Sequence, residues 1–81
     1  MKITIRFFAM LREVVGTDSI SLELSGSKPV FDVVKEIQVA FPGLEKYTSI
    51  TSFAVNGEYA KRDVMLQDGD ELALLPPISG G

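Results

Sequence analysis

The last seven residues of the sequence, LPPISGG from Leu75 to Gly81, are the ones best suited to chemistry. Pro76 and Pro77 have no backbone N–H and a fixed φ, so a β-strand that reaches them cannot continue in a sheet. They favour an extended path, and the six residues that start at Pro76 span at most about 20 Å. Gly80 and Gly81 have no side chains and fit a narrow channel. Frayed chain ends are also rich in such residues, so this stretch alone does not decide the function.

A tail of this kind is long enough to bring a terminal carboxylate into the active site of another protein. The carboxylate is that of Gly81, and the residues that lead to it are Pro76, Pro77, Ile78, Ser79 and Gly80. The sequence has no cysteine and no histidine, so it lacks thiol nucleophiles, imidazole bases and the usual nitrogen and sulfur metal ligands. Catalysis by a thiol or an imidazole of this chain is therefore excluded.

Three acidic residues near the end, Asp68, Asp70 and Glu71, are the remaining candidates for a metal site. Their Asp-Gly-Asp spacing is typical of a solvated turn, and the spacing of a calcium-binding loop is missing. The sequence also has no glycine-rich loop that could hold ATP. We expect neither a metal nor a cofactor bound to this chain.

The composition indicates one small domain without a nucleic-acid or membrane partner. The 81 residues are 46% hydrophobic, which suffices for a compact core. The net charge of −3 comes without a basic stripe, which argues against binding to nucleic acid. No apolar run approaches the roughly 20 residues of a membrane helix, and no signal peptide opens the sequence. The lack of cysteine is consistent with a cytoplasmic location.

Alternating hydrophobicity predicts strands at both ends of the sequence. Residues 2–8 alternate with one apolar face, which leaves Phe8 as a large aromatic residue on the polar face. Residues 19–24 alternate in the same way, and 71–75 form a last strand that leads into the prolines. Asn56-Gly57 between two short apolar runs predicts a hairpin over residues 52–60.

Helical spacing predicts one long helix. Its apolar stripe consists of Val30, Val33, Val34, Ile37 and Phe41. We expect Ser27 as its N-cap, Pro29 in its first turn, and an end at Phe41 before Pro42. Shorter helical turns are expected at residues 9–15, before Gly16, and around 45–47. A sheet with one helix packed across it predicts an α+β domain over residues 1–75, followed by a flexible tail over 76–81.

Several of these segments resemble one known family. They are the strand ending in Phe7-Phe8-Ala9, Arg12-Glu13 before Gly16, Phe41-Pro42 before Leu44, Ala54-Val55-Asn56, Asp68-Gly69-Asp70-Glu71 and the ending Leu75 to Gly81. Together they resemble the small, sulfur-carrying subunits of molybdopterin synthases, which are ubiquitin-like β-grasp proteins. The resemblance covers essentially the whole chain. It implies a mixed sheet of about four to five strands with one main helix packed across it.

The resemblance also implies a reaction at Gly81. In that family a partner similar to the ubiquitin-activating enzyme adenylates the terminal carboxylate with ATP and magnesium, and sulfur then replaces AMP to give a thiocarboxylate. The tail inserts into the large synthase subunit, which uses two such sulfurs to build the dithiolene of molybdopterin on a cyclic pyranopterin precursor. The resemblance thus implies that the residues from Pro76 to Gly80 insert with the reacting Gly81. The implied partners are the adenylating enzyme, a sulfur-donor protein and the large subunit, and they supply the catalytic groups, so this chain is expected to be a co-substrate. A chain without cysteine suits this role, because its α-carboxyl is the obvious place to hold sulfur.

Docking is expected to use apolar surface beside the tail. If the last strand runs parallel to the first, Phe8 and Leu75 lie at neighbouring strand ends, and we expect them to form an exposed patch with Met65 or Met10. Alternatively, Phe8 packs under the turn at residues 10–15 as ordinary core. Three other functions remain open: a protein modifier that forms isopeptide bonds to lysines, a sulfur carrier for thiamine or a tungsten cofactor, and an interaction module without tail chemistry.

Overall fold

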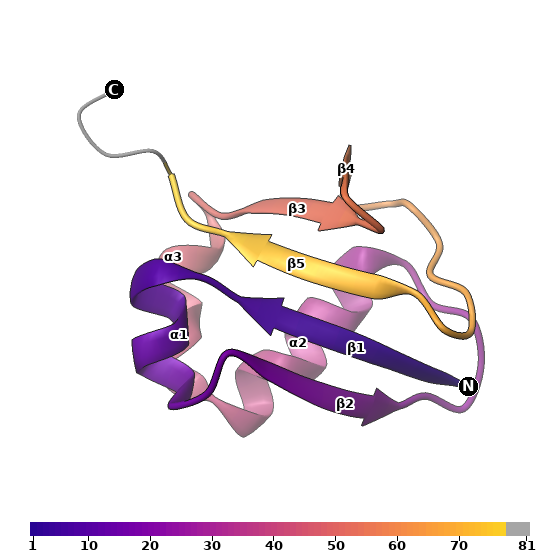
Figure 1. The fold of residues 1–81 in the computed structure, drawn as a ribbon, viewed down its shortest axis with the longest axis horizontal. Coiled ribbons are helices and arrows are strands. Elements are labelled where there is room, and N and C mark those ends of the chain that lie inside the picture. The colour runs from indigo at the N-terminus through magenta and orange to yellow at the C-terminus, as the bar shows by residue number, and fades with distance from the viewer. Residues whose placement is uncertain (78–81) are drawn as a thin grey trace.

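The computed structural model describes residues 1–77, and in them one mixed sheet carries a helix layer on one face (Figure 1). The strands are β1 (Lys2–Phe7), β2 (Ser19–Glu23), β3 (Ser52–Val55), β4 (Glu58–Ala60) and β5 (Glu71–Leu75). The helices are α1 (Ala9–Val15), α2 (Val30–Ala40), the 3₁₀ turn η1 (Pro42–Leu44) and α3 (Glu45–Thr48). The predicted α+β class and β-grasp arrangement are confirmed.

The sheet places the first and last strands side by side at its centre. The strand order is β2-β1-β5-β3-β4. β1 and β5 are parallel, with Phe7 opposite Leu74, and the other neighbours are antiparallel. Because β1 and β5 run in the same direction, the start of α1 and the end of β5 lie at the same end of the sheet (Figure 1).

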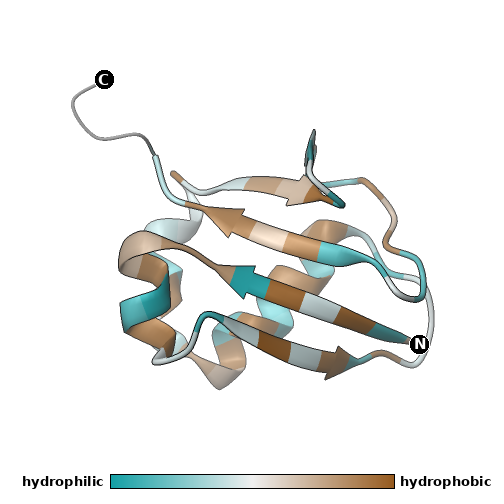
Figure 2. Ribbon diagram, in the orientation of Figure 1, coloured by the Kyte–Doolittle hydropathy of each residue, from teal (hydrophilic) through white to brown (hydrophobic). Residues whose placement is uncertain are grey.

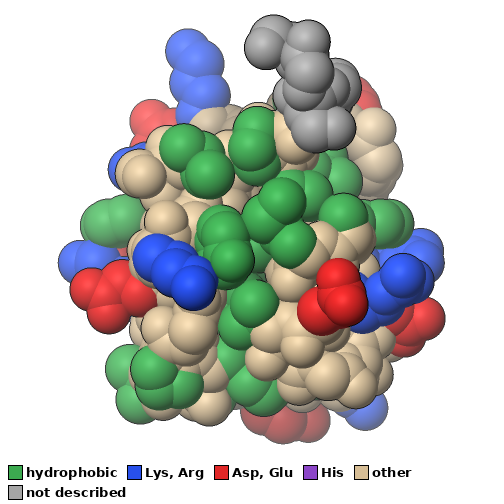
Figure 3. Space-filling view, turned by 90° about the vertical axis from the view of Figure 1, so that its left-hand side faces the viewer, with side chains coloured by type: hydrophobic (Ala, Val, Ile, Leu, Met, Phe, Trp, Pro, Cys, Tyr) green, Lys and Arg blue, Asp and Glu red, His purple; other side chains and the backbone are tan. Residues whose placement is uncertain are grey.

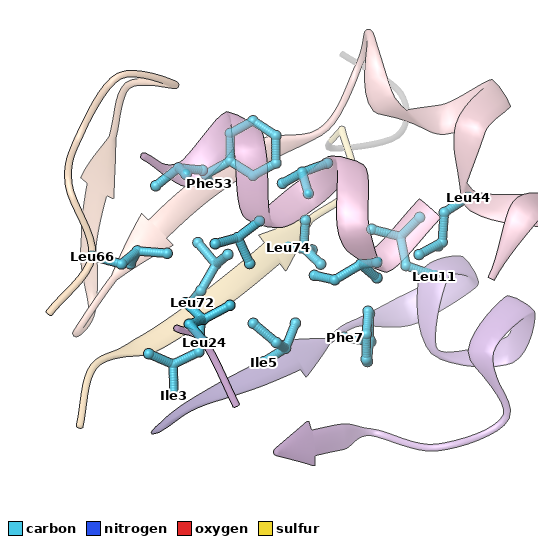
Figure 4. Packing of buried hydrophobic residues seen from close by; sticks show 14 residues of the cluster. Ile3, Ile5, Phe7, Leu11, Leu24, Leu44, Phe53, Leu66, Leu72 and Leu74 are labelled. Atoms are coloured by element: carbon cyan, nitrogen blue, oxygen red, sulfur yellow. The ribbon is translucent and has the colours of Figure 1, made fainter. Parts of the chain in front are cut away.

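The core lies between the sheet and α2. Along β1 every second residue is buried, and Figure 2 shows the matching alternation of hydropathy. Fourteen buried apolar side chains of the described chain form one cluster (Figure 4). From β1 and β5 it takes Ile3, Ile5, Phe7, Leu72 and Leu74, and from α2 it takes Val30, Val33, Val34 and Ile37. The predicted helix stripe is therefore the buried face of α2, while Phe41 is half-buried at its C-cap.

The start of α2 differs from the expected cap. Ser27 does not cap the helix, because its hydroxyl donates a hydrogen bond of 2.6 Å to the carbonyl of Leu66. Pro29 is the N-cap residue instead, with φ −70° and ψ 156°. The N–H groups of Val30 and Phe31 bond the carbonyls of Val64 and Arg62, each at 2.9 Å. A distant segment of the chain thus satisfies donors that a local side chain would otherwise satisfy.

The predicted turns are present. Gly16 has φ +89° and its N–H bonds the carbonyl of Arg12 at 2.8 Å, so it ends α1 as a C-cap glycine. Asn56 and Gly57 have φ of 51° and 85°, as a type I′ hairpin between β3 and β4 requires. Within residues 1–77 no helix is both long and apolar enough to cross a membrane.

Candidate functional site

The base of the tail lies at the end of β5. β5 ends at Leu75, Pro76 is half-buried and Pro77 is exposed. Leu75 pairs with Ser52 of β3, and its other neighbour is the end of β1, since Phe7 lies opposite Leu74. The chain therefore leaves the domain between two strands that fix its direction. The expected reacting residue Gly81, and the expected inserting residues Ile78, Ser79 and Gly80, lie outside the described residues.

Phe8 and Leu75 lie next to each other on the face of the sheet opposite α2. Leu72 and Leu74 point into the core, so alternation directs Leu75 to this outer face. Phe8 keeps an extended backbone, with φ −127° and ψ 152°, so the alternation of β1 continues through it. Both side chains are half-buried, so the patch that was expected to be exposed is exposed only in part at these two residues. Phe8 is not among the residues packed against the core cluster. The alternative in which Phe8 is ordinary core under α1 is therefore wrong.

Tyr59 is an outer-face residue that the sequence did not indicate. It lies opposite Ala54, which lies opposite Ala73 of β5. Since Ala73 faces outward with Leu75, the paired residues Ala54 and Tyr59 share that face. Tyr59 is 81% exposed, whereas Ala54 beside it is buried and Ala73 is half-buried. We call the five residues of this surface the outer-face patch: Phe8, Ala54, Tyr59, Ala73 and Leu75.

Charged residues border the outer-face patch beside β1 and β5. The guanidinium of Arg6 lies 5.4 Å from the centre of the Phe8 ring. Its Nη1 atom is also 4.0 Å from Oε1 of Glu71 across the parallel pair of strands. Both side chains are about half exposed, so this ion pair adds little to stability. An apolar centre with a charged rim is the usual composition of a protein–protein interface.

Met65 does not lie with these residues, which corrects the expectation that it joins the patch beside the tail. It forms an isolated bridge with Pro29 at the start of α2. Shortly after it in the chain, the N–H of Gly69 bonds the carbonyl of Lys2, the first residue of β1. Met65 therefore lies near the start of β1, whereas Phe8 and Leu75 lie at the ends of β1 and β5. Met10, the other methionine considered, lies in the first turn of α1 and is 39% exposed.

The acidic residues near the end of the chain hold a turn together. Asp68 accepts a hydrogen bond from the backbone N–H of Lys2 at 2.8 Å. Asp70 accepts one from the N–H of Gln67 at 2.8 Å and one from the side-chain amide of Asn56 at 2.9 Å. In the part of the chain that the structure describes, no group of three acidic side chains is arranged to hold a metal ion. Their geometry supports the interpretation as a structural turn.

A shallow hollow at the start of α2 is remote from the tail. It has a volume of about 300 Å³ and is lined by Pro29, Phe31, Asp32, Arg62 and Asp63. The ammonium of Lys35 and the guanidinium of Arg62 lie 4.5 and 5.7 Å from the centre of the Phe31 ring. These cations contact an aromatic wall. Because this hollow lies away from the tail, the end of β5 remains the candidate site.

Comparisons with known proteins find similarity over nearly the whole chain. A protein-family model described as the ThiS family matches residues 5–81. The molybdopterin synthase sulfur carrier subunit of Chlamydomonas reinhardtii is 37% identical over 83 residues, with all of both chains covered. Small archaeal modifier protein 1 of Haloferax volcanii is 35% identical over 85 residues, covering 94% of this chain and 97% of that protein. The crystal structure of SAMP1 from Haloferax volcanii has a TM-score of 0.89 at 31% identity, with both chains fully covered.

Proposed function

This chain belongs to the ThiS family, and we propose that it is the sulfur carrier subunit of a molybdopterin synthase. The observation that carries the proposal is the extent of the similarity. The family model runs through Gly81, and the Chlamydomonas reinhardtii relative matches this chain from end to end. The similarity therefore includes the tail on which the chemistry depends.

The proposed reaction takes place at the carboxylate of Gly81. A carboxylate is a poor electrophile, because it is anionic and its oxygen is a poor leaving group. Attack of this carboxylate on ATP forms an acyl-adenylate and releases pyrophosphate, which supplies AMP as a good leaving group. A sulfur nucleophile then attacks the carbonyl carbon and AMP departs, leaving a thiocarboxylate. ATP and magnesium bind the adenylating partner, and the sulfur at Gly81 is the only group this chain would carry.

The described residues support this role by their position around the tail. Pro76 and Pro77 follow the central strand β5 directly, so the tail starts from a strand that is paired on both sides. Pro77 is exposed, and the end of the outer-face patch nearest to it is Leu75, two residues before it in the chain. A partly exposed apolar surface that begins at the base of a reactive tail suits a protein that docks and then inserts. We therefore assign docking to Phe8, Leu75 and Tyr59.

The partners follow from the chemistry. We propose an adenylating enzyme similar to the ubiquitin-activating enzyme, a sulfur-donor protein and a large synthase subunit that receives the tail. We further propose, from the resemblance to the small subunits of molybdopterin synthases, that this chain and the large subunit form a heterotetramer. A cytoplasmic location is proposed because the chain has no cysteine to oxidise.

Mass spectrometry of the intact chain tests the proposal. The chain is incubated with the adenylating enzyme of the same organism, ATP, magnesium and sodium sulfide. We expect a mass gain equal to the exchange of one oxygen for sulfur, located at Gly81 by fragmentation. The chain without Gly81 is the control and should gain no sulfur. An unchanged mass of the full chain under conditions that consume ATP would defeat the proposal.

A second candidate function is protein modification, which the similarity to small archaeal modifier protein 1 favours. The same acyl-adenylate can react with a lysine amine and form an isopeptide bond with loss of AMP. This function predicts conjugates in which the carbonyl of Gly81 is bound to lysines of other proteins. Their presence in cells, identified by tryptic peptides in which residues 63–81, the segment after Arg62, are linked to a lysine of another protein, would establish the modifier function beside or in place of sulfur transfer.

A further inference from the structure

The end of the domain from which the tail leaves has a second group of exposed apolar side chains. Met10 and Ile50 are 39% and 51% exposed. Met10 lies in α1, two residues after Phe8, and Ile50 lies in the connection between α3 and β3. Ile50 is two residues before Ser52, which pairs with Leu75, so it lies level with the two prolines. Neither residue belongs to the outer-face patch.

The space-filling view of this end shows a broader apolar surface. Figure 3 shows hydrophobic side chains gathered on this face with few charged groups among them. Single exposed apolar residues are normal on a protein surface. An apolar area that continues across several elements is a different feature, and it is typical of an interaction site.

The length of the tail determines how close a partner must come. Four residues, 78–81, follow Pro77 and span at most about 14 Å. This inference rests on the proposed function, in which the carbonyl of Gly81 reacts inside a partner. The partner's reacting atoms must then lie within that distance of Pro77. A protein that surrounds a tail this short also meets the domain around the base of the tail, on the helix side as well as on the outer face of the sheet.

We propose that Met10 and Ile50 complete an apolar collar around the base of the tail, together with Phe8 and Leu75. The collar docks against the large synthase subunit at the mouth of the channel that receives the tail. Methionine suits such a surface, because its unbranched side chain adapts to the shape of a partner. The rim of that channel is expected to be apolar where it meets Met10 and Ile50.

The test compares two double variants with the same types of change at opposite ends of the domain. The collar variant is Met10→Ser with Ile50→Ser. The control is Val64→Ser with Met65→Ser, whose side chains are 36% and 49% exposed near the start of α2. Binding of each full chain to the large synthase subunit of the same organism is measured by isothermal titration calorimetry. Thermal unfolding of each variant alone checks that the fold is kept, and the single variant Ile50→Thr serves if the collar variant does not fold.

We expect the collar variant to bind roughly 10- to 30-fold more weakly than the wild-type chain, with the control within about twofold. For Ile50→Thr alone, a roughly threefold loss is expected. Unchanged binding of the collar variant, or equal losses in both double variants, would overturn the inference while the proposed function stands. A wild-type chain that gains no sulfur and does not bind the large subunit would instead overturn the proposed function, and this inference with it.

Discussion

Replacing Tyr59 with serine should weaken docking to the large subunit without changing the stability of the fold. Tyr59 is 81% exposed, so little of its surface contributes to folding. A tyrosine side chain buries about 150–250 Å² when covered, which leaves roughly 120–200 Å² for a partner to cover. At about 25 cal/mol per Å², full coverage would contribute roughly 3–5 kcal/mol. Incomplete coverage and the cost of ordering the side chain reduce this to about 2 kcal/mol, or roughly 30-fold in Kd.

The matched control for Tyr59 is Val39, which is 83% exposed on α2, in the layer on the other side of the sheet. Titration calorimetry with the large subunit should give a roughly 30-fold higher Kd for Tyr59→Ser and a value within about twofold of wild type for Val39→Ser. Urea unfolding should give free energies within about 0.5 kcal/mol of wild type for both variants. Equal Kd values for the two variants would refute the assignment of Tyr59 to the docking surface.

Two further predictions concern the fold that supports the tail. Leu72→Ala should lower the free energy of unfolding, measured by urea denaturation, by about 2–5 kcal/mol, because Leu72 is fully buried in the central strand β5. A loss below about 1 kcal/mol would contradict this packing. Asp70→Ala should lower the free energy of unfolding by about 1–2 kcal/mol in the same assay, because it removes the carboxylate that accepts hydrogen bonds from the N–H of Gln67 and the side-chain amide of Asn56. An unchanged unfolding midpoint would show that this carboxylate does not hold the turn.

The main elements of the fold could be predicted from local patterns. The alternation of Ile3, Ile5 and Phe7 gave a strand with one buried face, and the stripe from Val30 to Ile37 gave a helix with one buried side. Asn56-Gly57 specified the hairpin, because both residues tolerate positive φ. In each case the signal and the structure it specifies lie within a few residues of one another.

The errors arose where distant segments meet. Ser27 has the chemistry of an N-cap, but the carbonyls of Arg62 and Val64 satisfy the first N–H groups of α2. The position of Met65 depends on the path of the segment before β5, which no periodic pattern specifies. Tyr59 belongs to a three-residue strand, too short for alternation to assign its face until the pairing with Ala54 is known.

The candidate site, like the fold, could be predicted from the sequence only in part. The sequence itself indicated the tail, because prolines and glycines have strong effects on the local backbone conformation. The surface around the base of the tail could be predicted only with the register of β1 against β5 and of β5 against β3. This register brings Phe8, Leu75 and Ile50 to one end of the domain. Sequence reasoning anticipated the neighbours Phe8 and Leu75 only through the assumption that the first and last strands are parallel.

The central claim is that the carbonyl carbon of Gly81 delivers the sulfur that the large subunit consumes. A single-turnover reaction of thiocarboxylated chain with the large subunit and the cyclic pyranopterin precursor measures this delivery directly. The account predicts that two thiocarboxylates return to carboxylates for each molybdopterin formed, and that the chain without Gly81 yields none. Molybdopterin formed at the full rate by the chain that lacks Gly81 would contradict it.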